Sequence, residues 1–278
     1  MVEPPGIFRG RGEHPHAGRI KSRIVPEFVT INIGLEAPIP VCTLPGHSWK
    51  RIISNKEATW LANFKDERAS FTLSKYVMLA AESTVKGEND RLKYEKARRL
   101  KVEITKIRKN YHQMLKSEST VDNMLGVCTY LIDRLALRVG NEKGEDEADT
   151  VGCCSLRVEH VRFGKKNEIT LDFLGKDSMQ YLNTVTVEPQ VHKHLKSFTV
   201  GKKPKDELFD RVNAGRLNDY LKQNMEDLSA KVFRTYNASV TLCEELYKGN
   251  IDAESDSTDV KVKFYEDCNR KVALLCNH

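Results

Sequence analysis

The strongest constraint on the fold is a long apolar stripe near the middle of the chain. Its members recur at spacings of three and four residues: Ala97, Leu100, Ile104, Ile107, Tyr111 and Leu115. This spacing places all of them on one face of an α-helix, and that face needs other parts of the chain to cover it. We therefore expect one long helix that starts near residues 83–88. Between Arg91 and Lys116 the segment carries ten basic and two acidic residues, so its remaining surface is strongly basic.

The segment before this helix predicts strands. Short apolar runs span residues 28–33, 60–64 and 76–80, and proline and glycine residues separate them. Such runs with turn residues between them are typical of β-structure. We expect residues 1–82 to form a β-containing lobe, with a loop near residues 8–16.

The segment after the long helix opens with a second helix and a set of strands. The second helix carries Met124, Cys128, Leu131 and Leu135, and the Gly140-Asn141 pair is a fitting end for it. Strand-like runs follow at residues 155–163, 168–174 and 179–187. Gly-Lys-Lys-Asn and Gly-Lys-Asp turns separate these runs and favour antiparallel hairpins.

Helices resume beyond Pro189, and the acidic, polar stretch 249–259 predicts a surface loop. A last amphipathic stripe consists of Tyr265, Cys268, Val272 and Leu275. The sequence therefore predicts an α+β fold. Its second lobe, residues 83–278, is mainly helical and contains a three-stranded antiparallel sheet.

Composition excludes several classes of protein. Of the 278 residues, 40% are apolar, which is enough for a core and excludes wholesale disorder. No apolar run approaches the roughly 18 residues that cross a bilayer, so we expect neither a membrane protein nor a secreted one. The seven cysteines include no C-x-x-C pair, which indicates reduced thiols and predicts no metal site.

Charge is distributed unevenly. Residues 1–120 hold 22 basic and 13 acidic side chains, whereas the remainder holds 23 and 26. This asymmetry indicates that one half of the chain faces a polyanion. A soluble chain with one solvated basic helix would show the same asymmetry.

Common phosphate-loop, dinucleotide-binding and H-E-x-x-H motifs are missing from the sequence. The stretch Phe8–Gly12 (FRGRG) is basic and rich in glycine, as a flexible loop would also be. Four cations lie at the predicted ends of elements: Arg138, Lys176, Arg234 and His278. Taken singly, each could be a solvated or capping residue.

As an ordered set, these four residues resemble those of the eukaryotic type IB DNA topoisomerases. The resemblance runs over nearly the whole chain, and its matching segments include 3–6, 8–12, 45–47, 94–100, 148–160, 173–178 and 230–239. The string from Ala148 to His160, ADTVGCCSLRVEH, is far more specific than a short motif. The resemblance implies a fold like that of the type IB topoisomerases and tyrosine recombinases.

The resemblance also implies a chemistry. Family enzymes cut one DNA strand by tyrosine attack, which forms a 3′-phosphotyrosine link and releases a 5′-hydroxyl. Arg138 and Arg234 match two arginines that stabilise the nonbridging oxygens, and His278 matches a third donor to them. Lys176 matches the general acid that protonates the leaving oxygen. The resemblance implies no cofactor, neither ATP nor a metal ion.

Further positions match residues that contact DNA, so duplex DNA is the expected partner. Arg11 matches a minor-groove residue close to the cleavage site, and Asp177 also lies near that site in the family. The expected phosphate-contacting residues are Lys75, Tyr76, Lys143 and Thr150. The expected inhibitor pocket comprises Phe8, Gly10, Arg11 and Asp177. The basic helix over 91–116 is a further candidate for DNA contact, with a solvated helix face as its alternative.

One component of the family site is missing from the sequence. The family nucleophile lies in a Ser-Lys-x-x-Tyr segment beyond the histidine, and the sequence ends at that histidine. Ser74-Lys75-Tyr76 lacks the spacing. We expect a partial core whose tyrosine comes from a small subunit or a C-terminal segment. Such a chain would bind DNA but not cleave it alone, in the nucleus or in a DNA-containing organelle.

Two alternatives stay open at this point. A tyrosine recombinase or integrase domain would share the Arg, Lys, Arg, His and Tyr set, but recombinases usually carry His-x-x-Arg where this chain has Lys231-Val232-Phe233-Arg234. Recombinases also lack the motifs over residues 3–12. A non-catalytic DNA-binding scaffold is the second alternative.

Overall fold

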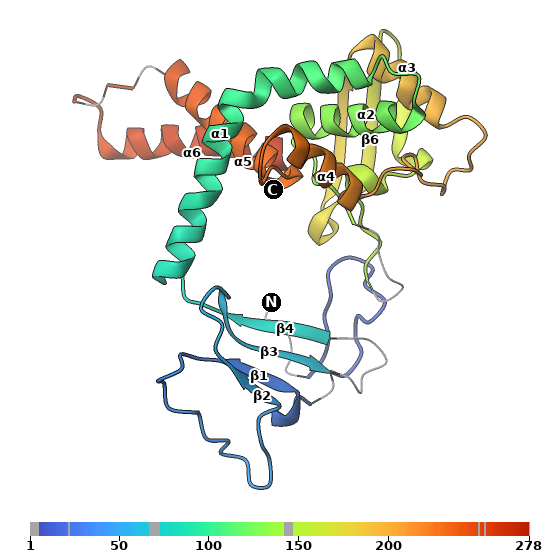
Figure 1. The fold of residues 1–278 in the computed structure, drawn as a ribbon. Coiled ribbons are helices and arrows are strands. Elements are labelled where there is room, and N and C mark those ends of the chain that lie inside the picture. Colours follow the sequence, from blue (N-terminus) through green and yellow to red (C-terminus); the bar gives the residue numbers. More distant parts are fainter. Residues whose placement is uncertain are drawn as a thin grey trace. The chain divides into compact units, whose positions relative to one another are not determined.

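The computed structural model describes residues 6–21, 23–66, 73–141, 147–249, 251–252 and 254–277. The chain forms two compact units, which divide within helix α1 between Leu92 and Lys93. Helix α1 (Thr84–Met114) is the long helix near the middle of the chain (Figure 1).

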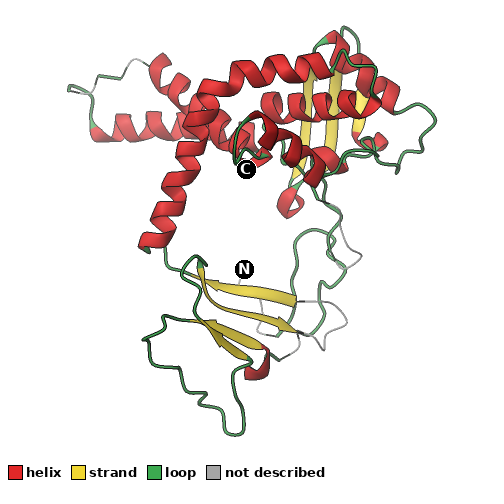
Figure 2. Ribbon diagram, in the orientation of Figure 1, coloured by secondary structure: helices red, strands yellow, loops and turns green. Residues whose placement is uncertain are grey.

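The first unit is built on a mixed four-stranded sheet (Figure 2). Its strands are β1 (Val29–Asn32), β2 (Arg51–Ile53), β3 (Trp60–Asp66) and β4 (Leu73–Met78), in the order β2-β1-β3-β4. The strand β2 pairs parallel with β1, whereas β1, β3 and β4 pair antiparallel. The apolar runs predicted β1, β3 and β4 but missed β2, which has only two consecutive apolar residues. A short 3₁₀ turn, Pro26–Phe28, leads into β1.

The predicted apolar stripe of α1 is confirmed. All six of its members are buried, and Leu100, Ile107 and Tyr111 are completely inaccessible to solvent. Helix α2 (Thr120–Leu135) packs against this stripe, and Ser119 caps its first turn through the N–H of Asp122.

A three-stranded antiparallel sheet follows, as the turn residues predict. It consists of β5 (Val161–Phe163), β6 (Glu168–Leu174) and β7 (Gln180–Thr186), with β6 in the middle. Alternate residues of β6 are buried, so one face of the sheet joins the core. The predicted strand over 155–163 is wrong in its first half. There the chain forms two 3₁₀ turns, Cys153–Ser155 and Val158–His160, and the N–H of Arg157 bonds to Nδ1 of His160.

Four helices complete the second unit: α3 (Pro189–Phe198), α4 (Ala214–Asn224), α5 (Ala230–Lys248) and α6 (Thr258–Cys276). The first three pack against α2, and α6 pairs with α5. The expected stripe on α6 is only partly covered: Cys268 is buried, Val272 and Leu275 are half-buried, and Tyr265 is half exposed. Within the described residues, no helix combines the length and apolar character required to span a membrane.

Candidate active site

A cavity of about 400 Å³ opens in the second unit beside the end of α2, the β6–β7 turn and the start of α5. Its described lining residues are Arg138, Val139, Gly140, Asn141, Thr150, Val151, Gly152, Lys176, Asp177, Ala230, Lys231 and Arg234. The cavity therefore brings together three of the four expected catalytic residues, which lie far apart in the sequence. Thr150 and Asp177, two of the expected DNA contacts, line it as well.

Arg138 reaches the cavity from an extended segment and not from a helix end. The expected helix to Gly140 is wrong, because α2 ends at Leu135 and Ala136 turns the chain with a φ of 51°. Beyond this turn, the carbonyl of Arg138 accepts the N–H of Cys153 at 2.8 Å, and that of Val139 accepts the N–H of Cys154 at 2.7 Å. These bonds fix the backbone from which the Arg138 side chain projects.

Two glycines let this segment lie directly against its neighbour. A Cβ added to Gly152 would stand 2.4 Å from the nitrogen of Gly140 and 2.8 Å from the carbonyl oxygen of Arg138. Gly140 also adopts a φ of 77°, which L-residues with side chains rarely adopt. The closeness of the two backbones requires glycine at both positions.

Lys176 lies at the tip of the β6–β7 hairpin. The N–H of Gly175 donates to the carbonyl of Met179 at 2.8 Å and closes the turn. Within the turn, Asp177 and Ser178 have φ values of 65° and 58°. The Lys176 side chain is exposed, so the hairpin presents an accessible ammonium group on a hydrogen-bonded turn.

Arg234 lies in the second turn of α5 and is half buried. Its Nη1 donates to the carbonyl of Ala136 at 2.7 Å, and its Nη2 donates to the carbonyl of Cys276 at 3.0 Å. Burial lowers the pKa of Arg234, and the positive charge of Arg138 lowers it further. Two positively charged guanidinium groups repel each other, and an anion that binds between them stabilises both.

Two expected site residues, His278 and Lys143, lie outside the described residues. The residues that precede His278 are held in place, because Arg234 bonds to Cys276 and the Asn277 side chain donates to the carbonyl of Gln180 at 3.2 Å.

The expected site residues of the first unit lie on a loop and a strand. Phe8 packs on the ring of His14, with centroids 4.7 Å apart, and Gly10 has a φ of 68° beside that ring. Arg11 belongs to the same exposed loop. Asp177 belongs to the second unit, so the expected inhibitor pocket stays a prediction.

Lys75 and Tyr76 are consecutive residues of β4, and therefore project on opposite faces of the sheet. Tyr76 is half exposed and packs edge-on against Trp60, with centroids 5.8 Å apart.

Many cations of the basic helix are paired within the chain. At least six of the ten basic residues between Arg91 and Lys116 form ion pairs: Arg91, Lys96, Arg98, Arg99, Lys106 and Arg108. Most of these pairs are exposed, so they weaken the basic surface without removing it. DNA contact by this helix stays a prediction.

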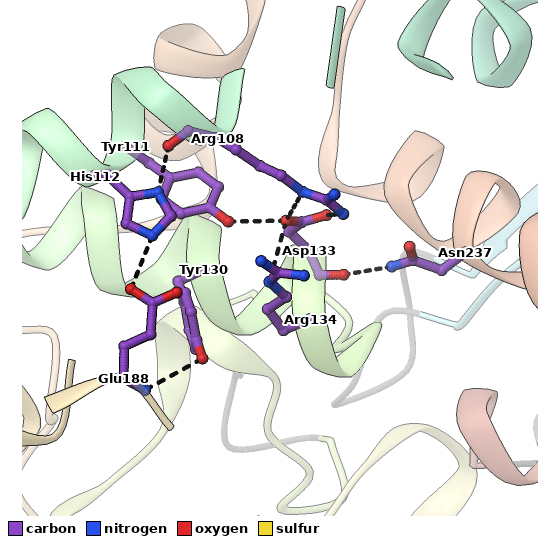
Figure 3. Close-up of polar contacts among 8 residues, drawn as sticks. All are labelled: Arg108, Tyr111, His112, Tyr130, Asp133, Arg134, Glu188 and Asn237. Atoms are coloured by element: carbon purple, nitrogen blue, oxygen red, sulfur yellow. Dashed lines mark hydrogen bonds and ion pairs between the residues drawn. The ribbon is translucent and has the colours of Figure 1, made fainter. Parts of the chain in front are cut away.

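Sequence reasoning missed a buried polar network around Asp133 (Figure 3). The Asp133 side chain is fully buried and accepts bonds from Nε and Nη2 of Arg108 at 2.9 and 3.1 Å. It also accepts a hydrogen bond from the hydroxyl of Tyr111 at 2.9 Å. Burial raises the pKa of Tyr111, and the negative charge of the Asp133 carboxylate raises it further. The available signal was an acidic residue within the apolar run of α2. Among the described residues, no group of three or more His, Cys, Asp and Glu side chains is placed to hold a metal ion.

Comparison with known families identifies both parts of the chain. Residues 82–278 match the family model described as eukaryotic DNA topoisomerase I, catalytic core, and residues 1–79 match its DNA-binding fragment. The chain belongs to the eukaryotic DNA topoisomerase I family. Both the predicted family and the predicted α+β fold are thereby confirmed, and the recombinase alternative is not supported.

Individual relatives agree with this family assignment. The chain is 53% identical to DNA topoisomerase 1 of Schizosaccharomyces pombe and 50% identical to DNA topoisomerase 1 beta of Arabidopsis thaliana. It is 48% identical to DNA topoisomerase 1 of Homo sapiens. Each match covers the whole of this chain but only 33%, 30% and 36% of those topoisomerases, respectively. The chain thus spans about a third of their length.

Proposed function

We propose that residues 1–278 act as the core of a type IB DNA topoisomerase, which relaxes supercoiled duplex DNA by transient cleavage of one strand. The observation that carries this proposal is the convergence of Arg138, Lys176 and Arg234 on one cavity. In this proposal, residues 1–82 form part of the lobe that clamps DNA, and residues 83–278 form the catalytic lobe.

The two arginines provide charge for the transition state. A pentacovalent phosphorus concentrates negative charge on its nonbridging oxygens, and fixed guanidinium groups stabilise that charge more than they stabilise the ground state. Arg138 and Arg234 face the same cavity on backbones held by several hydrogen bonds. His278 is the proposed third donor.

Lys176 is the proposed general acid. In the cleavage step the tyrosine hydroxyl gives its proton to water and its oxygen forms a bond to phosphorus, while the bond from phosphorus to the 5′-oxygen breaks. The Lys176 ammonium gives its proton to that leaving oxygen, and the free 5′-hydroxyl results. Religation reverses each transfer. Since the phosphotyrosine link keeps the energy of the original ester, the cycle needs no ATP.

The tyrosine has to come from outside these 278 residues, because they contain no Ser-Lys-x-x-Tyr segment. A following segment or a separate small subunit would provide it. We propose that these residues alone bind duplex DNA in the nucleus without cleaving it.

The remaining expected contacts belong to the same proposal. Arg11, Lys75, Tyr76, Lys143 and Thr150 would contact the duplex, mostly at phosphates, which gives affinity with little sequence preference. Phe8, Gly10, Arg11 and Asp177 would form a pocket for inhibitors that bind at the cleaved strand.

The test is complementation. The purified chain alone should shift a duplex in a binding assay but leave supercoiled plasmid intact. Addition of a polypeptide that carries the Ser-Lys-x-x-Tyr segment should restore relaxation and a covalent DNA adduct. Relaxation or an adduct with the chain alone would contradict the expected need for a second segment.

The scaffold alternative gives a different result in the same assay. A scaffold would bind DNA but fail to cleave after complementation, and Arg138→Ala would then reduce only binding. Under our proposal, Arg138→Ala and Arg234→Ala abolish cleavage and largely spare binding.

A further inference from the structure

The carboxyl end of α2 is held by two side chains from successive turns of α5. The last four carbonyls of any helix lack partners inside that helix and need others. Asn237 donates its Nδ2–H to the carbonyl of Asp133 at 2.7 Å, and Arg234 donates to the carbonyl of Ala136 at 2.7 Å. The donors are three residues apart on α5, and the acceptors are three residues apart on the other segment. The two bonds therefore fix how far α5 can slide along α2.

The acceptor side of this contact is rigid. The Asp133 side chain is fully buried and receives the paired nitrogens of Arg108 and the hydroxyl of Tyr111, both from α1 (Figure 3). These bonds join the last turn of α2 to a second helix. Asn237 is half buried and reaches the same residue from the opposite side, through its backbone oxygen.

The hydrogen bond from Asn237 to Asp133 joins the two segments that carry the cavity arginines. Arg138 follows Asp133 by five residues, and Arg234 precedes Asn237 by one turn of α5. Asn237 does not line the cavity, whereas both arginines do. A shift of α5 against α2 would change the distance between the two guanidinium groups.

We propose that Asn237 is a positioning residue for strand transfer, which sets the separation of Arg138 and Arg234 by anchoring α5 to the end of α2. This role rests on the proposed function. It predicts that loss of the Asn237 amide slows cleavage and religation while the affinity for DNA stays the same.

The experiment compares Asn237→Ala with Asn110→Ala in the tyrosine-complemented chain. Asn110 donates one bond of equal length, 2.7 Å to Asn224 Oδ1, and lies outside the cavity lining, so its loss controls for a general effect on stability. We expect Asn237→Ala to lower the single-turnover rate of cleavage about tenfold, as for one lost hydrogen bond. The control should stay within about twofold, and both variants should bind duplex DNA like the wild type.

A second variant separates positioning from mere folding. In Asn237→Asp, the ionised carboxylate has no proton for the carbonyl of Asp133, whereas the protonated acid can donate one. The charged and titratable groups at this contact come from three helices, and both variants keep them. They include Arg108 and Tyr111 of α1, Asp133 and Arg134 of α2, and Arg234 and Tyr236 of α5. The cleavage rate of Asn237→Asp relative to that of Asn237→Ala should therefore rise as the pH falls from 7 to 5.

The outcomes are distinct. The positioning role is supported if Asn237→Ala cleaves more slowly than the wild type and if the ratio of the Asn237→Asp rate to the Asn237→Ala rate rises as the pH falls. Two results would overturn the positioning role but leave the proposed function intact, provided that the complemented wild type cleaves DNA. The first is an Asn237→Ala variant that cleaves at the wild-type rate. The second is a ratio of the Asn237→Asp rate to the Asn237→Ala rate that does not change between pH 7 and 5. If the complemented wild type does not cleave at all, the proposed function fails, and the role of Asn237 fails with it.

Discussion

The four-stranded sheet of the first unit and the three-stranded sheet of the second bury very different amounts of apolar side chain. Among the described residues of the first unit, the buried ones are His16, Pro26 and Asn32. In the second unit, β6 alone buries Ile169, Leu171 and Phe173, and a continuous core extends from α1 to α5.

The second unit therefore has the packed core that holds side chains in precise positions. The side chain of Asn32 links three segments of the first unit. Its Nδ2 donates to the carbonyls of Asn55 and Trp60, both at 3.0 Å, and its Oδ1 accepts the N–H of Asn55 at 2.8 Å. A sheet held in this way, with exposed side chains on β4, suits a surface that binds a partner. Strand transfer needs donors fixed to fractions of an ångström, and a packed core provides that rigidity.

The largest expected effect comes from the second unit. Arg234→Ala removes the proposed donor to the reacting phosphate, and it also removes two bonds to backbone carbonyls. We expect single-turnover cleavage by the complemented enzyme to fall about 10³-fold, with little change in duplex affinity. Arg162→Ala is the matched control, since Arg162 is an exposed cation that pairs with Asp172. A similar loss in the control would break the contrast between the cavity and the surface.

Truncation of apolar side chains should affect the two units unequally. Ile107→Ala creates a cavity in the core of the second unit, where Ile107 is fully buried, and should lower the free energy of unfolding by about 3 kcal/mol. Val77→Ala, on β4 of the first unit, should change it by less than about 0.5 kcal/mol, because Val77 is 58% exposed. Urea unfolding followed by circular dichroism measures both, and equal losses would contradict the comparison.

Two glycine substitutions should have opposite signs. Gly152→Ala forces a methyl group onto the backbone of Gly140 and should destabilise the second unit by about 2 kcal/mol. Gly87→Ala lies in α1 with nothing within 4 Å of the added carbon. It should stabilise the chain by about 0.5 kcal/mol through helix propensity. Thermal unfolding of both variants checks the signs, and a neutral Gly152→Ala would show that the segment beside Arg138 can adjust.

The smallest expected effect is a dependence of stability on pH. Burial lowers the pKa of His160 below its usual value of 6.5, and the charge of Arg157 lowers it further. The unfolded chain therefore binds this proton more readily, so stability falls as the pH drops through about 6.5. The wild type should lose stability relative to His160→Gln between pH 7.5 and 5.5. A difference that is constant over this range would show that His160 titrates as it does in the unfolded chain.

The sequence predicted those features that depend on local patterns. The stripe of α1 follows from helical spacing, and the Lys176 hairpin follows from its Gly-Lys-Asp turn. The left-handed Ala136 could not be predicted, because alanine gives no signal for such a turn and its carbonyl is held by Arg234, 98 residues away. The Asp133 network depends on the packing of α1 against α2 in the same way. That Arg138, Lys176 and Arg234 form one site came from the family resemblance and not from spacing.

The most direct test of the account concerns Lys176 and the leaving oxygen. A substrate with sulfur in place of the 5′-bridging oxygen releases a thiolate, whose conjugate acid has a pKa of about 8.5, so its departure needs no proton. Lys176→Ala should cleave ordinary DNA about 10²–10⁴-fold more slowly than the wild type after complementation. It should cleave the sulfur substrate at nearly the wild-type rate. Equal slowing on both substrates would contradict the assignment of Lys176 as the general acid of this cavity.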